Sequence, residues 1–232
     1  MSLSRQPSSE QPLEFFMGGK PLQRVQELNI LGVKFSRSLG FQSHVNSIAD
    51  RAGQRVSALR SIAPCLNPQG RARVYKAHVR STMEYAPLAW MSASTMHLKK
   101  LDDVQRRAVR IIKAPPQELK IDPLSHRRTV AGLGLMYRLH TEGAPALLKT
   151  MLPPARVTSR STRASSSLGS FALQGLTGRA ESGHWSLAQH DRSFIPAMVP
   201  VWNSLPDAIV GHPTTTGTKA FCSRTHNFLN NL

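Results

Sequence analysis

Two adjacent aspartates, Asp102 and Asp103, are the residues whose types most directly suggest catalysis. They lie within LKKLDDVQRRAVRIIKAPP, residues 98–116. Carboxylate pairs hold catalytic metal ions in many phosphoryl-transfer enzymes, but the carboxylates must converge on ions roughly 4 Å apart. Neighbouring residues on a helix point about 100° apart, so this pair converges poorly. We therefore predict that both aspartates pair with Arg106 and Arg107 at helical spacings of three and four residues, and that neither is catalytic.

Other motifs that could carry chemistry are weak in this sequence. It has nine histidines but no Cys-x-x-Cys motif and no His-x-x-x-His pair on a clear helix, so the usual spacing of zinc ligands is missing. The Gly-Leu-Gly at residues 132–134 lacks the strand and spacing of a dinucleotide fingerprint and indicates a break between helices instead. We expect no catalytic residue, no bound cofactor or metal, and no small-molecule substrate.

The charge of the chain points to an anionic partner. Its 232 residues contain 30 Lys and Arg against 13 Asp and Glu, a formal net charge of +17. Residues 41–120 alone hold 14 basic and 5 acidic residues. An ordinary solvated face mixes both signs, so this imbalance favours contact with phosphates of RNA or DNA.

The sequence also predicts where the protein is found. Cys65 and Cys222 show no paired spacing, which is typical of a reducing compartment. The first residues lack the apolar core of a secretory signal, and no run of about 18 apolar residues occurs. We expect an intracellular protein that does not span a membrane, with nucleus and cytoplasm not distinguished.

The basic residues lie on segments with helical periodicity. Apolar residues recur every three or four positions in residues 41–62, with Val45 and Leu59 among them. A second helix is predicted to start at Asn67-Pro68 and to stop near Pro87, and a third to span residues 98–112 before Pro115-Pro116. The residues expected to contact phosphates on these helices are Arg51, Arg55, Arg71, Arg73, Lys76, Arg80, Arg106, Arg107, Arg110 and Lys113.

The regions on either side are less regular. Leu13–Met17 and Asn29–Phe35 are predicted strands, with a tight turn at Gly18-Gly19 and a possible returning strand at residues 21–25. A fourth helical region begins at Asp122-Pro123 and continues unevenly to His140, with a short turn over residues 146–151.

The C-terminal third contains two short apolar runs and a closing helix. The runs at residues 170–176 and 192–202 could pair as strands or pack as extended segments, and residues 214–229 suggest a helix with Phe221 and Phe228 on one face. The predicted fold is mainly α: a helical, thumb-like bundle preceded by a small β-hairpin and followed by an irregular α+β portion. The expected parts are a disordered terminus (1–12), a hairpin region (13–40), a basic helical domain (41–152), a linker (153–170) and a C-terminal tail (171–232).

Several ordered blocks resemble a known family. ILGVKF (30–35) followed by FQSHVNSIADRAGQRVSALRSI (41–62) is similar to the segment after the palm of reverse transcriptases from non-LTR, jockey-like retrotransposons. RVYKAHVRSTMEYAPLAW (73–90) and LKKLDDVQRRAVRII (98–112) resemble the next two blocks, and WNSLPDAIV (202–210) resembles the C-terminal tail of these RNA-directed DNA polymerases.

The resemblance implies a role for each part. The palm of the family ends in a hairpin that steadies the primer strand, which would place Leu31, Gly32 and Val33 in a primer-grip-like position. The helices after it would be the thumb, which grips the template–primer duplex. The family's catalytic aromatic-x-Asp-Asp hairpin has no counterpart in this sequence, so Mg²⁺ and nucleotidyl transfer would belong to an upstream palm.

The expected function is therefore that of a reverse-transcriptase remnant without the catalytic palm, which binds RNA or an RNA–DNA hybrid through phosphates. Two alternatives stay open. One is a structural or assembly fragment with no independent activity, and the other is a metal-dependent nuclease that uses Asp102 and Asp103.

Overall fold

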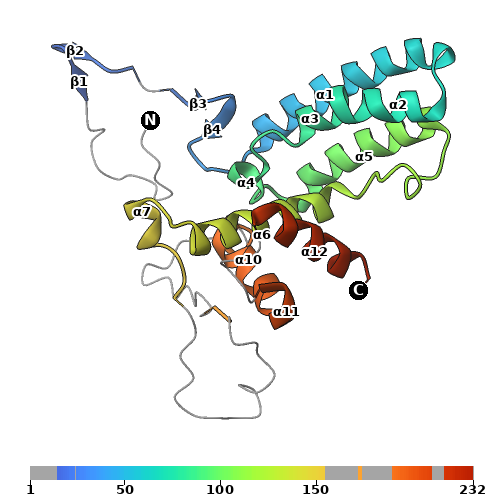
Figure 1. Ribbon diagram of the computed structural model, residues 1–232. Coiled ribbons are helices and arrows are strands. Elements are labelled where there is room, and N and C mark those ends of the chain that lie inside the picture. Colours follow the sequence, from blue (N-terminus) through green and yellow to red (C-terminus); the bar gives the residue numbers. More distant parts are fainter. Residues whose placement is uncertain (1–14, 24, 155–171, 174–189, 211–216, 232) are drawn as a thin grey trace. The chain divides into compact units, whose positions relative to one another are not determined.

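The computed structural model describes residues 15–23, 25–154, 172–173, 190–210 and 217–231. The chain divides into two compact units, the first ending at Ala114 and the second starting at Pro115. Helices dominate both units and two small antiparallel hairpins precede them (Figure 1), which confirms the predicted mainly α fold with a small N-terminal β element. The predicted disordered terminus and nearly all of the predicted linker lie outside the described residues.

Two hairpins open the first unit. β1 (Phe16–Met17) pairs with β2 (Lys20–Pro21) around Gly18 and Gly19, whose φ angles are 58° and 76°. Positive φ at both central residues is the geometry of a type I′ turn, which glycine adopts without strain. The predicted turn is thus confirmed. The returning strand, β2, starts directly after the turn, earlier than the predicted residues 21–25.

The second hairpin corrects the sequence analysis. β3 (Glu27–Ile30) pairs with β4 (Val33–Ser36), so the single strand predicted over residues 29–35 is wrong. The chain reverses at Leu31 and Gly32, with φ angles of 49° and 82°. The apolar residues on both sides of Gly32 hid this turn because Leu31 is not a usual turn residue.

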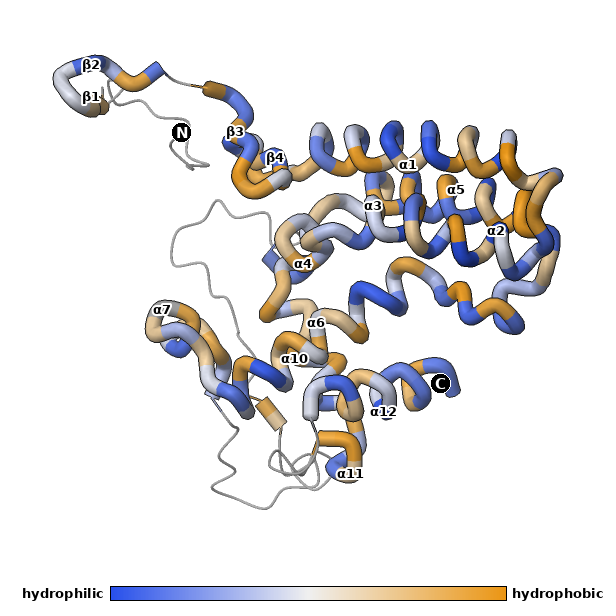
Figure 2. The backbone as a smooth tube through the Cα atoms, turned by 45° about the horizontal axis from the view of Figure 1, so that its top comes forward, coloured by the Kyte–Doolittle hydropathy of each residue, from blue (hydrophilic) through white to orange (hydrophobic). Residues whose placement is uncertain are grey.

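Three helical segments form the body of the first unit. α1 (Gln42–Ile62) and α5 (Thr95–Ile112) pack against each other, and Figure 2 shows hydrophilic and hydrophobic residues alternating along both. The predicted apolar face of α1 is confirmed from Val45 to Leu59, whereas Ile62 is exposed. A short 3₁₀ turn, η1 (Ala63–Cys65), follows α1.

After η1 comes one continuous helical run of three parts. It comprises α2 (Pro68–Val74), the π-helix η2 (Tyr75–Arg80) and α3 (Ser81–Met83). Asn67 caps it as predicted, because its side chain accepts a hydrogen bond from the Gly70 amide at 2.7 Å. A further short helix, α4 (Pro87–Trp90), ends in a Trp90 side chain that is completely buried.

The second unit is also helical. α6 (Leu124–Thr141) packs against α10 (Phe194–Asn203) and α12 (Thr218–Asn230), while α7 (Ala146–Lys149) and α11 (Asp207–Val210) are single turns. The rings of Tyr137 and Phe221 stack with centroids 4.3 Å apart, and Trp202 lies 5.8 Å from Phe221. These aromatic rings form the core that joins α6, α10 and α12.

Two predictions for this unit are wrong. The run at residues 192–202 was expected to be extended, but most of it forms α10. The expected break at Gly132 and Gly134 does not occur, since both glycines are buried inside α6. A Cβ on Gly134 would lie 2.5 Å from the Sγ of Cys222 on α12, so glycine here permits close helix packing.

Candidate nucleic-acid interface

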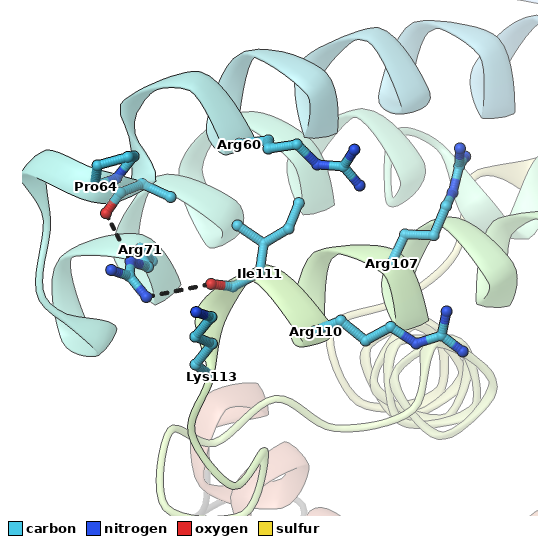
Figure 3. A pocket seen from close by; sticks show the side chains of 8 residues that line it. Arg60, Pro64, Arg71, Arg107, Arg110, Ile111 and Lys113 are labelled. Carbon is cyan, nitrogen blue, oxygen red and sulfur yellow. Dashed lines mark hydrogen bonds between the residues drawn. The ribbon is translucent and has the colours of Figure 1, made fainter.

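A basic pocket lies where α1, α2 and α5 meet in the first unit. Its volume is about 630 Å³. We call it the basic pocket; it is lined by Arg60, Ala63, Pro64, Arg71, Arg107, Arg110, Ile111 and Lys113 (Figure 3). Five of these eight residues are cationic and none is acidic, so the pocket is suited to an anion.

The ends of two helices place most of these cations. Arg60 lies in the last turn of α1, and Arg110 lies in the last turn of α5. Arg107 precedes Arg110 by three residues, so both project from the same side of α5. Lys113 ends α5 in the left-handed conformation, with φ 60°, and its amide donates to the Val109 carbonyl at 3.2 Å.

Arg71 is fixed by two hydrogen bonds to backbone carbonyls. Its Nε donates to the Ala63 carbonyl at 2.9 Å, and its Nη1 donates to the Ile111 carbonyl at 3.4 Å (Figure 3). Carbonyls at the ends of helices have no intrahelical partner, and a cation there also interacts favourably with the helix dipole. Arg71 therefore has a structural role that ties α2 to the ends of the other two helices.

Helix dipoles alone do not account for the whole cluster. Each helix C-terminus carries the equivalent of about −0.5 charge, so the ends of α1 and α5 offset roughly one positive charge. Five cations line the pocket, which leaves about four uncompensated among the lining residues. Because like charges repel, an anion bound among these cations would be attracted by all of them and would lower their mutual repulsion.

The structure brings together four of the ten basic residues predicted to contact phosphates. Arg71, Arg107, Arg110 and Lys113 line the basic pocket. The other six do not line it: Arg51, Arg55, Arg73, Lys76, Arg80 and Arg106.

Arg51, Arg55 and Arg80 are among those six, and each contacts another group of the protein. The Nη1 of Arg55 donates to the His78 carbonyl at 2.6 Å and to the Thr82 hydroxyl. The Nε of Arg80 lies 3.6 Å from a carboxylate oxygen of Glu84. Arg51 donates to the Ser47 carbonyl at 3.4 Å. These contacts hold the side chains near the protein surface, away from the pocket.

Arg60 was absent from the predicted set although it lies on the polar face of its helix. Its role depends on α1 ending beside the last turns of α5, and local sequence patterns do not predict how two helices pack. The Arg107 side chain also reaches the middle of α1, since a Cβ on Gly53 would lie 3.4 Å from its Nη2. A usable signal in the sequence was the position of Arg60 in the final turn before the cap at Asn67.

One of the ion pairs predicted for the two aspartates is present. Asp103 forms an ion pair with Arg106, three residues further along α5. Among the residues that the structure describes, no three histidine, cysteine, aspartate or glutamate side chains gather as metal ligands would. The geometry therefore gives no support to a metal site at Asp102 and Asp103.

The residues expected at a primer-grip-like position form the turn between β3 and β4. Leu31 is 86% exposed at its tip, whereas Val33 is buried. The Tyr85 hydroxyl donates to the Leu31 carbonyl at 2.9 Å, and a Cβ on Gly32 would lie 3.3 Å from the Tyr85 ring. The turn is thus fixed to the helical body, and its contact with a primer stays a prediction.

A second polar cluster lies in the second unit, between α6 and α12. The Nε2 of His126 and the Nδ1 of His226 are 2.8 Å apart, and the Nε2 of His226 lies 4.0 Å from a carboxylate oxygen of Asp122. Burial lowers the pKa of His126, and the neighbouring His226 lowers it further. The two nitrogens of His226 face different partners, so these side chains cannot converge on one metal ion.

Comparison of the chain with protein-family models, curated proteins and solved structures gives no match. In the part of the chain that the structure describes, no helix combines the length and the apolar character needed to cross a membrane.

Proposed function

We propose that this chain binds nucleic acid, as RNA or an RNA–DNA hybrid, by holding phosphates at the basic pocket. The role is that expected of the thumb of a non-LTR reverse transcriptase. One observation carries the proposal: five cations from three helical segments line a single pocket of about 630 Å³ without an acidic neighbour among the lining residues.

The chemistry of the pocket suits phosphate groups. Arginine presents a planar fork of donors that matches two phosphate oxygens at once, and lysine adds a point charge. Neutralising a phosphate also releases its condensed counterions, which supplies most of the sequence-independent affinity. No base-reading contact is needed, so binding by this mechanism tolerates any sequence.

The proposal assigns binding, and no catalytic step, to these residues. In the family that the sequence resembles, nucleotidyl transfer depends on an aromatic-x-Asp-Asp hairpin, and this sequence contains no such motif. Magnesium would accompany that hairpin, in a palm with which this chain would act.

The salt dependence of binding tests this function. Affinity of the full chain for a short RNA–DNA hybrid would be measured by fluorescence anisotropy between about 50 and 200 mM salt. Each phosphate contact contributes about 0.7 to 0.9 to the slope of log affinity against log salt. Replacing Arg60, Arg107, Arg110 and Lys113 by Gln should therefore reduce the slope by roughly three.

The matched control removes four charges elsewhere. It replaces four exposed residues outside the pocket by Gln: Arg37, Lys99, Lys120 and Lys149. This control variant has the same net charge as the pocket variant and should leave the slope within about one unit of the original. Equal reductions in both variants would show that diffuse charge, and not the pocket, binds the hybrid. An absence of binding in the unaltered chain would favour the structural or assembly alternative.

A further inference from the structure

The volume of the basic pocket suits a group larger than a single phosphate. A sphere of the same volume, about 630 Å³, is about 11 Å across. That volume lies within the range of about 300 to 1,000 Å³ that is typical of small-molecule sites. The side chains of Arg107 and Arg110 are exposed, so phosphates of a duplex and of a smaller group can both reach them.

The floor carries a fixed charge beside apolar surface. Arg71 is half-buried, and both of its backbone hydrogen bonds hold it next to Ala63 and Ile111. Ala63, Pro64 and Ile111 are the apolar lining residues. In the view of Figure 3 the Ile111 side chain lies between Arg71 and Lys113 on one side and the remaining cations on the other. A ligand that fits must combine several negative charges with an apolar or flat portion.

The amount of charge also points to a compact polyanion. About four of the five lining charges remain after the helix ends are taken into account. An internal phosphate of a strand carries one negative charge, whereas a terminal phosphate carries about 1.5 to 2 at neutral pH. A chain of two or three linked phosphates at one end therefore concentrates enough charge in this space, and the attached nucleoside supplies the apolar portion.

We infer, building on the phosphate-binding role proposed above, that the basic pocket binds the 5′-polyphosphate group of a nucleotide. The group belongs either to a free nucleoside triphosphate or to the 5′ end of a strand. Arg60, Arg107, Arg110 and Lys113 contact the phosphates, Arg71 fixes the floor, and Pro64 and Ile111 contact the nucleoside.

The first test measures binding of inorganic triphosphate to the full chain by calorimetric titration. Saturable binding at one site per chain is expected. Arg107→Gln and Arg110→Gln should each weaken it roughly tenfold, as expected for loss of a charge-assisted hydrogen bond. Both side chains are exposed, so neither change removes packing, and circular dichroism checks that the helices persist.

Lys99→Gln is the matched control. Lys99 is exposed on the same helix, eight residues before Arg107, which is about 12 Å along the axis. That distance exceeds the Debye length of about 8 Å at physiological ionic strength. The control should therefore change triphosphate affinity by less than about twofold. Non-saturable binding, or an equal loss in the control, would overturn the inference.

Two further probes identify the source of the group. A nucleoside triphosphate that binds more tightly than inorganic triphosphate supports the apolar contacts and a free nucleotide. A 5′-triphosphorylated oligonucleotide that binds more tightly than both the nucleoside triphosphate and the same oligonucleotide with a 5′-hydroxyl supports a strand end.

The 5′-hydroxyl RNA–DNA hybrid separates this inference from the proposed function. If the hybrid binds and triphosphate does not, the inference fails while the phosphate-binding role stands. If triphosphate binds and the hybrid does not, the pocket is a nucleotide site and the proposed function fails.

Discussion

The close approach of α6 and α12 at Gly134 predicts that a glycine-to-alanine change inside a helix lowers the free energy of unfolding. Replacing a glycine by alanine inside a helix ordinarily stabilises it by about 1 kcal/mol. Here the new Cβ would lie 2.5 Å from the Cys222 Sγ, far inside the optimal separation of about 3.5 to 4 Å. Overpacking of this kind costs about 1 to 3 kcal/mol, so Gly134→Ala should lower the free energy of unfolding by up to about 2 kcal/mol.

A second glycine supplies a control substitution that should raise the free energy of unfolding. Gly53 also lies inside a helix, α1, but the nearest atom to an added Cβ is the end of the flexible Arg107 side chain at 3.4 Å. Gly53→Ala should therefore stabilise the first unit by about 0.5 to 1 kcal/mol. The two substitutions are chemically identical and differ only in what surrounds the added methyl group.

A double-mutant cycle with Cys222→Ala tests the cause. Removing Sγ creates room, so Gly134→Ala made in the Cys222→Ala background should recover the ordinary helical gain of about 1 kcal/mol. Urea denaturation followed by circular dichroism gives the four free energies. If Gly134→Ala stabilises the unaltered chain as much as Gly53→Ala does, the close contact of α12 with Gly134 is refuted.

Three further predictions follow from individual contacts. Arg71→Met removes both hydrogen bonds to the Ala63 and Ile111 carbonyls and should destabilise the first unit by about 1 to 3 kcal/mol, measured by denaturation; an unchanged midpoint would refute its structural role. The pKa of His126 is lowered, first by burial and then by His226 and Arg127, with Asp122 opposing. The neutral form is therefore favoured in the folded state, so its contribution to stability is present above about pH 6.5 and is lost as pH falls through the lowered pKa. Thermal melts between about pH 7.5 and 5 should show this loss, and a His126→Asn variant whose melts are equally pH-dependent would contradict it. Asp103→Asn breaks an exposed ion pair with Arg106 and should cost at most about 1 kcal/mol, whereas a magnesium-dependent nuclease activity abolished by this change would refute the non-catalytic assignment.

Local patterns in the sequence predicted the long helices of the first unit. Apolar spacing identified α1 and α5 because burying one face is what stabilises a helix in a protein. The Asn67-Pro68 pair identified the start of α2 because its cap is made by neighbouring residues. Both signals act within a few residues, so the sequence contains them directly.

Features that depend on distant partners could not be predicted in this way. Gly132 and Gly134 suggested a break because glycine is a poor helix former, but the role of Gly134 is set by α12, far along the chain. The turn at Leu31 and Gly32 is held partly by Tyr85. Similarly, four of the five pocket cations were in the predicted set, but only the packing of α1 against α5 brings Arg60 to them.

The most direct test of the phosphate-binding role is the affinity of the full chain for a 5′-hydroxyl RNA–DNA hybrid at about 0.1 M salt, compared between Arg107→Gln and Lys99→Gln. One phosphate contact contributes about 0.9 to the slope of log affinity against log salt. Losing one contact therefore lowers the affinity roughly eightfold at this salt concentration. Arg107→Gln should therefore weaken binding about eightfold, and Lys99→Gln less than about twofold. Equal losses in the two variants, or no measurable binding by the unaltered chain, would contradict the assignment of the basic pocket as the nucleic-acid interface.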